Sequence, residues 1–157
     1  MGAIFEYLQA DHDRLEALLA RATAEPGRIG PEPFARFREG LLRHIGMEEK
    51  ALFAAYKAAR GEPVPEFARL RADHARLTAL LVPTPTAAIV AEIRAILGPH
   101  DLLEEEPGGV YQVCEEALGD SACELLVKLR ETPVPPLRPY YDRRRPVILE
   151  GLEDERG

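Results

Sequence analysis

The four histidines of this 157-residue chain all lie on apolar stripes with helical spacing. Two of them are followed four residues later by a glutamate on the same stripe, and the other two each follow an aspartate. Side chains four residues apart lie on the same face of a helix, so each histidine and its glutamate can point at one centre. The chain must therefore fold so that it buries six potential metal ligands. They are His12, His44, Glu48, His74, His100 and Glu104.

The size and composition are those of an ordinary soluble protein. The hydrophobic fraction is 46% and the charged fraction 30%, and a chain of 157 residues is expected to form one domain with a real core. No apolar run is long enough to cross a membrane, and the first residues lack the pattern of a signal peptide. We therefore expect a cytoplasmic protein.

The net charge of −7 argues against binding to nucleic acid or to an anionic membrane. The run Arg143-Arg144-Arg145 is the only candidate basic patch, and we expect it to be a solvated part of a tail. The two cysteines, Cys114 and Cys123, fit neither a redox pair nor a zinc ribbon, and we expect free thiols.

Apolar periodicity predicts an all-α fold with four long helices. The stripes cover residues 4–22, 34–55, 67–81 and 89–104, and proline-rich or glycine-rich loops separate them. We expect Thr84 to cap the fourth helix, with Pro85 at its first position. Short helices are predicted over residues 110–118 and 121–129.

Short loops predict an up-down-up-down four-helix bundle. The bundle would span residues 1–131, and residues 132–157 would form a proline-rich strap or tail. In the tail, Tyr140, Tyr141 and residues 146–149 are possible interaction residues.

The register of the predicted bundle brings most of the histidines to one level. His12 and His44 lie at similar distances from the first turn, but His100 lies at least one helical turn farther from its loop than His74 does. Proline inside a helix removes a backbone hydrogen bond, so Pro99 should either kink the fourth helix just before His100 or end the helix.

The chain contains an internal repeat. Residues 11–19 resemble residues 73–81 at an offset of 62, and the two His-x-x-x-Glu motifs recur at an offset of 56. This pattern indicates a duplicated helical hairpin, in which each half supplies two histidines and one glutamate.

The buried glutamates point to bound cations. A buried carboxylate is strongly unfavourable unless it is paired or binds a metal, and no lysine or arginine lies on the stripes. Four imidazoles and two carboxylates suit a pair of ions, and this donor mixture favours iron over zinc. Zn or Mn are possible substitutes.

Several neighbouring polar residues are weaker candidates. We expect Glu49, Glu105 and Glu106 to lie on a solvated face, whereas Glu16 is a possible outer or alternative ligand. Three tyrosines could reach the site, although packing is the simpler interpretation. They are Tyr7, Tyr56 and Tyr111.

These motifs resemble the hemerythrin-like, HHE cation-binding family over about residues 1–118. The resemblance implies a di-iron centre in which His12 and His44 hold one non-haem iron and His74 and His100 hold the other. It also implies that Glu48 and Glu104 bridge the two irons. Oxygen-carrying hemerythrins have a second histidine on the third helix, where this chain has Thr78. In the fourth motif, Val110-Tyr111 corresponds only loosely to Leu52-Phe53 of the second.

Three functions are compatible with this sequence. The protein could bind iron and a diatomic ligand such as O2 or NO for sensing, storage or stress response. It could instead be a di-iron peroxidase or oxidase, or an iron-delivery factor for repair of iron-sulfur clusters, but no catalytic residue can be assigned. It could also be a bundle with vestigial histidines. A homodimer is possible.

Overall fold

The structure is a computed structural model, and it describes residues 2–142. This part of the chain is helical and contains no β-strand. None of its helices is both long and apolar enough to cross a bilayer. The elements are α1 (Ala3–Ala22), α2 (Pro31–Gly46), the π-helix η1 (Met47–Leu52), α3 (Phe53–Arg60), α4 (Phe67–Leu80), α5 (Ala87–Glu105), α6 (Val110–Leu118), the 3₁₀ turn η2 (Gly119–Ser121) and α7 (Ala122–Arg130).

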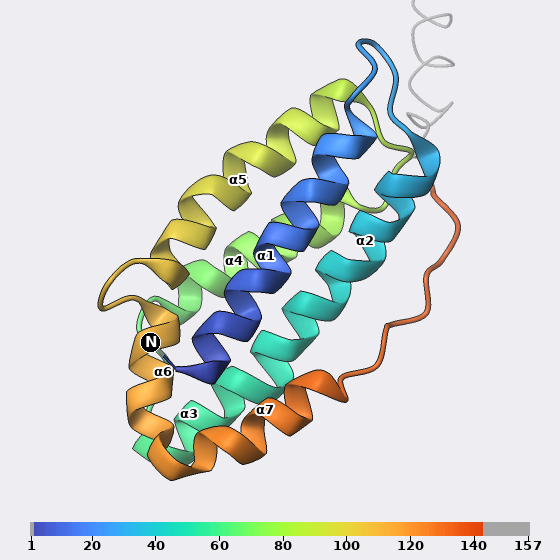
Figure 1. Cartoon of the computed structure of the whole chain (residues 1–157). Helices are drawn as coiled ribbons and strands as arrows, with labels where there is room; N and C mark the ends of the chain where they lie inside the picture. Colours follow the sequence, from blue (N-terminus) through green and yellow to red (C-terminus); the bar gives the residue numbers. More distant parts are fainter. Residues whose placement is uncertain (1, 143–157) are drawn as a thin grey trace, which may run out of the picture.

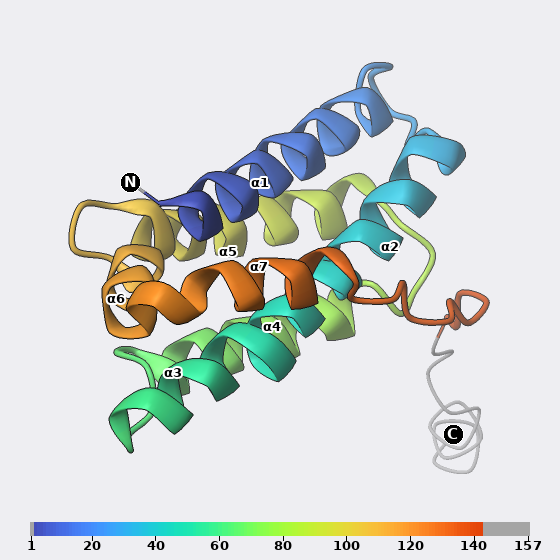
Figure 2. The same cartoon turned by 60° about the horizontal axis from the view of Figure 1, so that its bottom comes forward.

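Four long helical segments lie side by side and form a helical bundle (Figure 1). They are α1, α2 with its continuation through η1 and α3, α4, and α5. The two short helices α6 and α7 fold back over one end of the bundle, and α7 packs against α1 and η1 (Figure 2). Both short helices were predicted, to within one residue at each end.

The apolar core consists of two separate clusters. One contains Leu8, Met47 and Leu70 together with residues of α6 and α7. The other contains Leu15, Leu77 and further residues of α1, α2, α4 and α5. On every long helix the histidine lies between these two clusters in sequence, and Glu48 and Glu104 follow one turn after His44 and His100. The polar site therefore forms a layer through the middle of the bundle.

The second long helix changes its winding at the site. The residues after Gly46 form a π-helical turn, which ends at Leu52 before ordinary α-helix resumes. Periodicity predicted one continuous helix here and gave no sign of the change. A π-turn alters the direction in which side chains point and is frequent at functional sites. In this chain it carries Glu48 and Glu49.

The fourth long helix begins later than predicted and does not break at its proline. Thr86, not Thr84, is the N-cap, because its side-chain oxygen accepts a hydrogen bond from the Ile89 amide at 3.2 Å. α5 then continues through Pro99 to Glu105, so the predicted alternative of a helix break was wrong.

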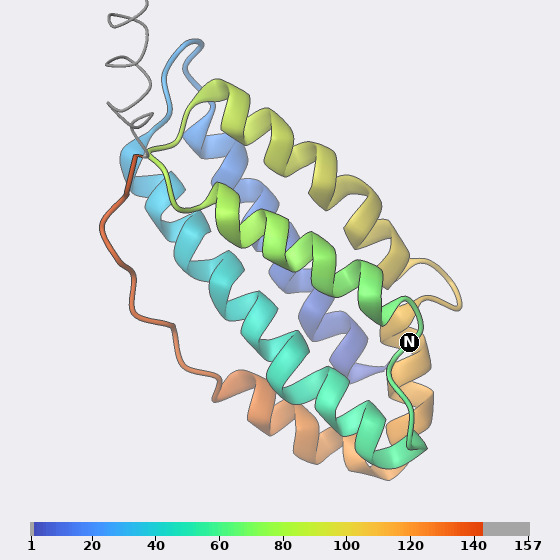
Figure 3. The same ribbon diagram turned by 180° about the vertical axis from the view of Figure 1, so that it is seen from behind.

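The expected mismatch between α4 and α5 is absorbed mainly by their connection. Residues 81–86 join helix ends at different heights along the bundle (Figure 3). Non-helical chain covers more distance per residue than an α-helix, so this short segment can offset the two helices. His74 and His100 consequently meet.

Two arginines of α2 hold the chain that follows α7. Arg43 donates hydrogen bonds to the carbonyl groups of Leu129 and Thr132.

The buried Arg38 donates hydrogen bonds to the carbonyl groups of Leu81 and Arg138. Its guanidinium also lies 4.3 Å from the centre of the Tyr140 ring, whereas Tyr141 is exposed. Residues 132–142 therefore run along the outside of the bundle (Figure 1). Residues 143–149, which include the arginine run, lie outside the described residues.

Two glycines of α2 should respond oppositely to alanine. A Cβ at Gly40 would meet Leu15 Cδ2 and Arg14 Nη2 at 2.8 Å, whereas a Cβ at Gly46 would meet nothing within 4 Å. We expect Gly46→Ala to raise the free energy of unfolding by about 0.5–1 kcal/mol, because alanine loses less backbone entropy than glycine. Gly40→Ala should lower it, since the buried Leu15 side chain would have to shift. Denaturant unfolding of both variants checks this, and equal effects would contradict the packing.

Candidate metal centre

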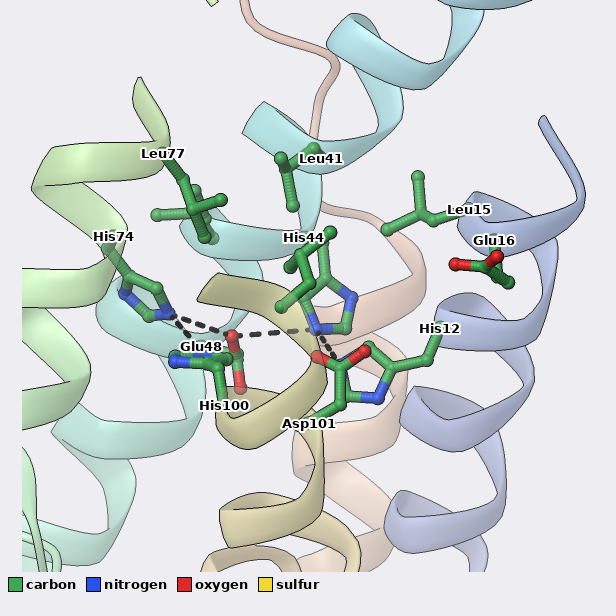
Figure 4. Close-up of a pocket in the computed structure, with 12 residues that line it drawn as sticks. His12, Leu15, Glu16, Leu41, His44, Glu48, His74, Leu77, His100 and Asp101 are labelled. Atoms are coloured by element: carbon green, nitrogen blue, oxygen red, sulfur yellow. Dashed lines mark hydrogen bonds and ion pairs between the residues drawn. The ribbon is translucent and has the colours of Figure 1, made fainter. Parts of the chain in front are cut away.

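The four imidazoles converge in pairs in the middle of the bundle (Figure 4). The Nε2 atoms of His12 and His44 lie 3.0 Å apart, and those of His74 and His100 lie 3.2 Å apart. Nitrogen ligands about 2.0–2.1 Å from a common ion are separated by roughly 3 Å. The imidazole pairs therefore have the spacing of ligands on one ion.

The two glutamates lie between the imidazole pairs and are fully buried. Glu48 Oε1 lies 3.3 Å from His74 Nε2 and 3.5 Å from His44 Nε2. Glu104 Oε1 lies 3.3 Å from His100 Nε2 and 3.5 Å from His12 Nε2. Each carboxylate thus contacts one histidine of each pair.

The carboxylate oxygens are not satisfied by the protein alone. Glu48 Oε1 and Glu104 Oε2 are buried without a hydrogen-bond partner. Buried oxygens of this kind are strongly unfavourable unless a cation or a donor approaches them. The donor set present, imidazole and carboxylate, therefore fits bound metal ions.

The ligand atoms fall into two clusters that share one residue. His12, His44 and Glu104 form the first, called here the His12 half-site. Glu48, His74, His100 and Glu104 form the second, called the His74 half-site. All six predicted ligand residues are thus brought together in one buried layer.

Every imidazole is also held from its outer side by a carboxylate. His12 Nδ1 lies 2.6 Å from Glu105, and His44 Nδ1 lies 2.8 Å from Asp11. His74 Nδ1 lies 3.2 Å from Glu49, and His100 Nδ1 lies 3.1 Å from Asp73. A carboxylate at Nδ1 favours the tautomer whose Nε2 lone pair faces a metal.

The expectation for Glu49 and Glu105 was therefore wrong. Both are only partly exposed and hydrogen-bond to imidazoles, while Glu106 is exposed as expected. The sequence signal for them was their place directly after Glu48 and Glu104 in both repeats. Equivalent residues of the two repeats make equivalent hydrogen bonds. Asp11 and Asp73 each contact the histidine of the following long helix, and Glu105 and Glu49 each contact a histidine of the other half.

Tyr111 also reaches the site, although the sequence favoured a packing role for it. Its hydroxyl oxygen lies 3.0 Å from both His12 Nε2 and Glu48 Oε2. It lies 3.2 Å from His44 Nε2 and 3.3 Å from Glu104 Oε1. Tyr56 packs in the apolar core instead, and Tyr7 lies beside Arg43 and Arg130.

A tight turn places Tyr111 at the site. Gly108 has a φ of +77°, and a Cβ on Gly109 would meet the backbone carbonyls of Leu103, Glu104 and Glu106 at 2.8–2.9 Å. Only glycine at position 109 allows α6 to begin this close to the end of α5.

A cavity of about 20 Å³ adjoins the ligands. Leu15, Leu41 and Leu77 line its apolar side (Figure 4). Glu16 lies at its exposed edge and belongs to neither ligand cluster. Thr78 is exposed and does not line this cavity, so the position that faces the site on α4 is Leu77.

Without a cation, the site holds protons. Burial disfavours the charged form of His12, but hydrogen bonds to Glu104 and Glu105 outweigh this effect and raise its pKa to about 11. The pKa of His100 rises to about 9, because Glu104 outweighs the effect of burial. Burial and the adjacent Glu104 raise the pKa of Glu48. Burial and Glu104 also bring the pKa of Asp101 to about 7, although His12 opposes them.

These pKa values predict that rising pH destabilises the metal-free protein and increases the stabilisation by metal. In metal-free protein, protonated His12 and His100 stabilise the fold fully below an unfolded pKa near 6.5, and the contribution is lost as pH rises through about 9 and about 11. The metal-free melting temperature should therefore fall by several degrees between pH 7 and pH 11. Cations compete with these protons, so the stabilisation by metal should grow over the same range. Calorimetry of chelator-treated and metal-loaded protein measures both melting temperatures as a function of pH. Melting temperatures that change in parallel for the two forms would contradict competition between cations and the protons on His12 and His100.

The carboxylates that contact the Nδ1 atoms of the histidines should strengthen metal binding. Asp11→Ala is expected to weaken metal binding by about 10–100-fold, because the His44 imidazole loses its partner. The exposed Asp13 on the same helix provides the control, since Asp13→Ala should leave the affinity unchanged. Competition with a metal chelator gives both affinities, and equal values for the two variants would show that Asp11 has no role.

The sequence model of the hemerythrin HHE cation-binding domain family matches residues 3–83. The match contains His12, His44, Glu48 and His74. The remaining ligand candidates, His100 and Glu104, lie beyond it and join the site through the fold. The chain matches no curated protein and no solved structure. The match covers about half of the chain, and on this basis the chain belongs to the hemerythrin HHE cation-binding domain family.

Proposed function

We propose that this protein holds a non-haem di-iron centre and uses it to bind a diatomic molecule such as O2 or NO. The observation that carries the proposal is the pair of buried ligand clusters that share Glu104. Two carboxylates, each in contact with one histidine of each imidazole pair, suit two cations a short distance apart.

The donor atoms support iron as the metal. The site offers imidazole nitrogen and carboxylate oxygen but no thiolate, a mixture that suits iron and that zinc or manganese can also occupy. A bound iron would supply positions at which a small molecule can bind. His12, His44, Glu48, His74, His100 and Glu104 would hold the two ions.

The size of the cavity favours a small molecule as the ligand. Its volume of about 20 Å³ is enough for one water-sized molecule, and leucines line its apolar side. A larger substrate would require the helices to separate. Binding of a diatomic molecule would serve sensing, storage or a stress response.

We also propose that the chain follows the hemerythrin-like plan throughout. The long helices would alternate up, down, up and down over residues 1–131. Residues 132–142 would then belong to a proline-rich strap or tail. The arginine contacts to residues 132 and 138 support this division.

A di-iron peroxidase is the second candidate function. Asp101 favours it, because this half-buried carboxyl group lines the cavity and its Oδ1 atom has no hydrogen-bond partner. Oδ1 lies 3.6 Å from His12 Nε2. A carboxyl group in this position could hold or release a proton beside a bound peroxide.

Metal content and optical spectra test the proposal. Protein loaded anaerobically with Fe(II) should bind about two irons per chain and change its visible spectrum on exposure to O2 or NO. Reversal on removal of the gas supports binding, whereas sustained consumption of peroxide supports the enzyme. A chain that binds no iron and is equally stable without it would overturn both functions.

His74→Ala should lose most metal from the His74 half-site and lower the melting temperature of the loaded protein, because binding energy contributes to folding. Arg76→Ala changes an exposed residue of the same helix and serves as the control. Metal analysis and thermal unfolding compare the variants. Unchanged metal content in His74→Ala would refute the ligand assignment.

A further inference from the structure

The two half-sites offer different numbers of donors from imidazole and carboxylate side chains. The His74 half-site has four such residues, and the His12 half-site has three. The internal repeat supplies each half with the same residue types, so this shortage does not come from a missing histidine or glutamate. Glu48 lies outside the His12 half-site, although its Oε1 atom is 3.5 Å from His44 Nε2, so this half-site has one donor residue fewer than the other.

The Tyr111 hydroxyl lies where the fourth donor belongs. Its distances to His12 Nε2, His44 Nε2 and Glu104 Oε1 are 3.0, 3.2 and 3.3 Å. The distance between the two imidazole nitrogens is 3.0 Å, and that from His12 Nε2 to Glu104 Oε1 is 3.5 Å. Five of the six distances among these four donor atoms are therefore 3.0–3.5 Å. They are close to the roughly 3.3 Å edge of a regular tetrahedron whose centre lies about 2.0 Å, an ordinary metal–ligand bond length, from each corner.

The Tyr111 side chain is held in this position. It is fully buried, its ring stacks on the His12 imidazole with centroids 5.6 Å apart, and it meets Phe5 edge-to-face. The glycine turn before α6 fixes where the ring enters the bundle. The hydroxyl therefore needs no rearrangement to face the ligand atoms.

The other half of the repeat shows what this position looks like without a hydroxyl. Phe53, the loose counterpart of Tyr111, stacks on the His74 imidazole with centroids 6.3 Å apart. Both aromatic rings thus cover one histidine of their half-site. Of these two rings only Tyr111 carries an oxygen into the centre, and it does so at the half-site with fewer donor residues.

We propose that Tyr111 is the fourth ligand of the His12 half-site and binds its cation as a phenolate. This inference rests on the proposed function, since it requires a cation in that half-site. The phenol loses one proton to solvent as its oxygen binds, and no electron is transferred. The two half-sites then differ in charge, because one holds an additional anionic oxygen. An anionic oxygen ligand favours ferric over ferrous iron.

Zinc titration of metal-free protein provides the first test. Zn²⁺ has no visible absorption of its own, and a phenol that becomes a phenolate shifts its ultraviolet absorption to longer wavelength. We expect about two Zn²⁺ and one tyrosinate signal per chain. Tyr111→Phe should abolish this signal and weaken one of the two zinc sites by at least about tenfold, while the other keeps its affinity.

Tyr56→Phe is the matched control, since Tyr56 is buried in the apolar cluster and should leave the signal intact. Oxidised, iron-loaded protein provides the second test. The wild type should show a phenolate-to-iron charge-transfer absorption in the visible range, and Tyr111→Phe should lack it.

The outcomes separate this inference from the proposed function. Failure to bind zinc or iron at about two ions per chain would overturn the proposed centre itself. Two bound ions without a tyrosinate signal in the wild type would leave that centre in place and overturn only the role of Tyr111. Because the wild-type titration decides this point, the result stands even if Tyr111→Phe does not fold.

Discussion

The burial of two carboxylates in the middle of an apolar bundle is the constraint on which the rest of the structure depends. Glu48 and Glu104 are fully buried, and apolar clusters lie on both sides of their layer. Such charges are strongly unfavourable unless other groups compensate them. Imidazoles from all four long helical segments surround them, and four outer carboxylates hold these imidazoles in turn. Metal-free protein compensates with protons, and loaded protein would compensate with cations, so pH and metal act on the same atoms.

The internal repeat explains both the order of the site and its asymmetry. Each half supplies an aspartate, two histidines and two consecutive glutamates, and their contacts are repeated across the centre. The halves differ in the aromatic residue that covers one histidine, Phe53 on one side and Tyr111 on the other. They differ also at Asp101, whose counterpart in the first motif is the apolar Ile45. The two half-sites of the repeat are therefore unlike.

Much of this centre could be predicted from the sequence, because helical periodicity ties spacing directly to geometry. Residues four apart share a face whatever surrounds them, so the six ligand candidates and the two short helices could be predicted. Contacts between helices carry no such rule. The outer roles of Glu49 and Glu105 were missed because an acidic residue beside a buried one usually faces solvent. The late start of α5 and the continuous helix through Pro99 also depended on packing between neighbouring helices.

The sequence by itself determined the apolar face of each long helix and that two carboxylates on these faces would need a cation. The tertiary structure decided what meets at the centre. A π-helical turn carries Glu48, the connection of residues 81–86 offsets α4 from α5, and Gly109 brings α6 close enough for Tyr111 to reach the ligands. What each of these features brings together depends on distances between different helices. Spacing along one helix cannot specify such distances, since they arise only when the helices pack.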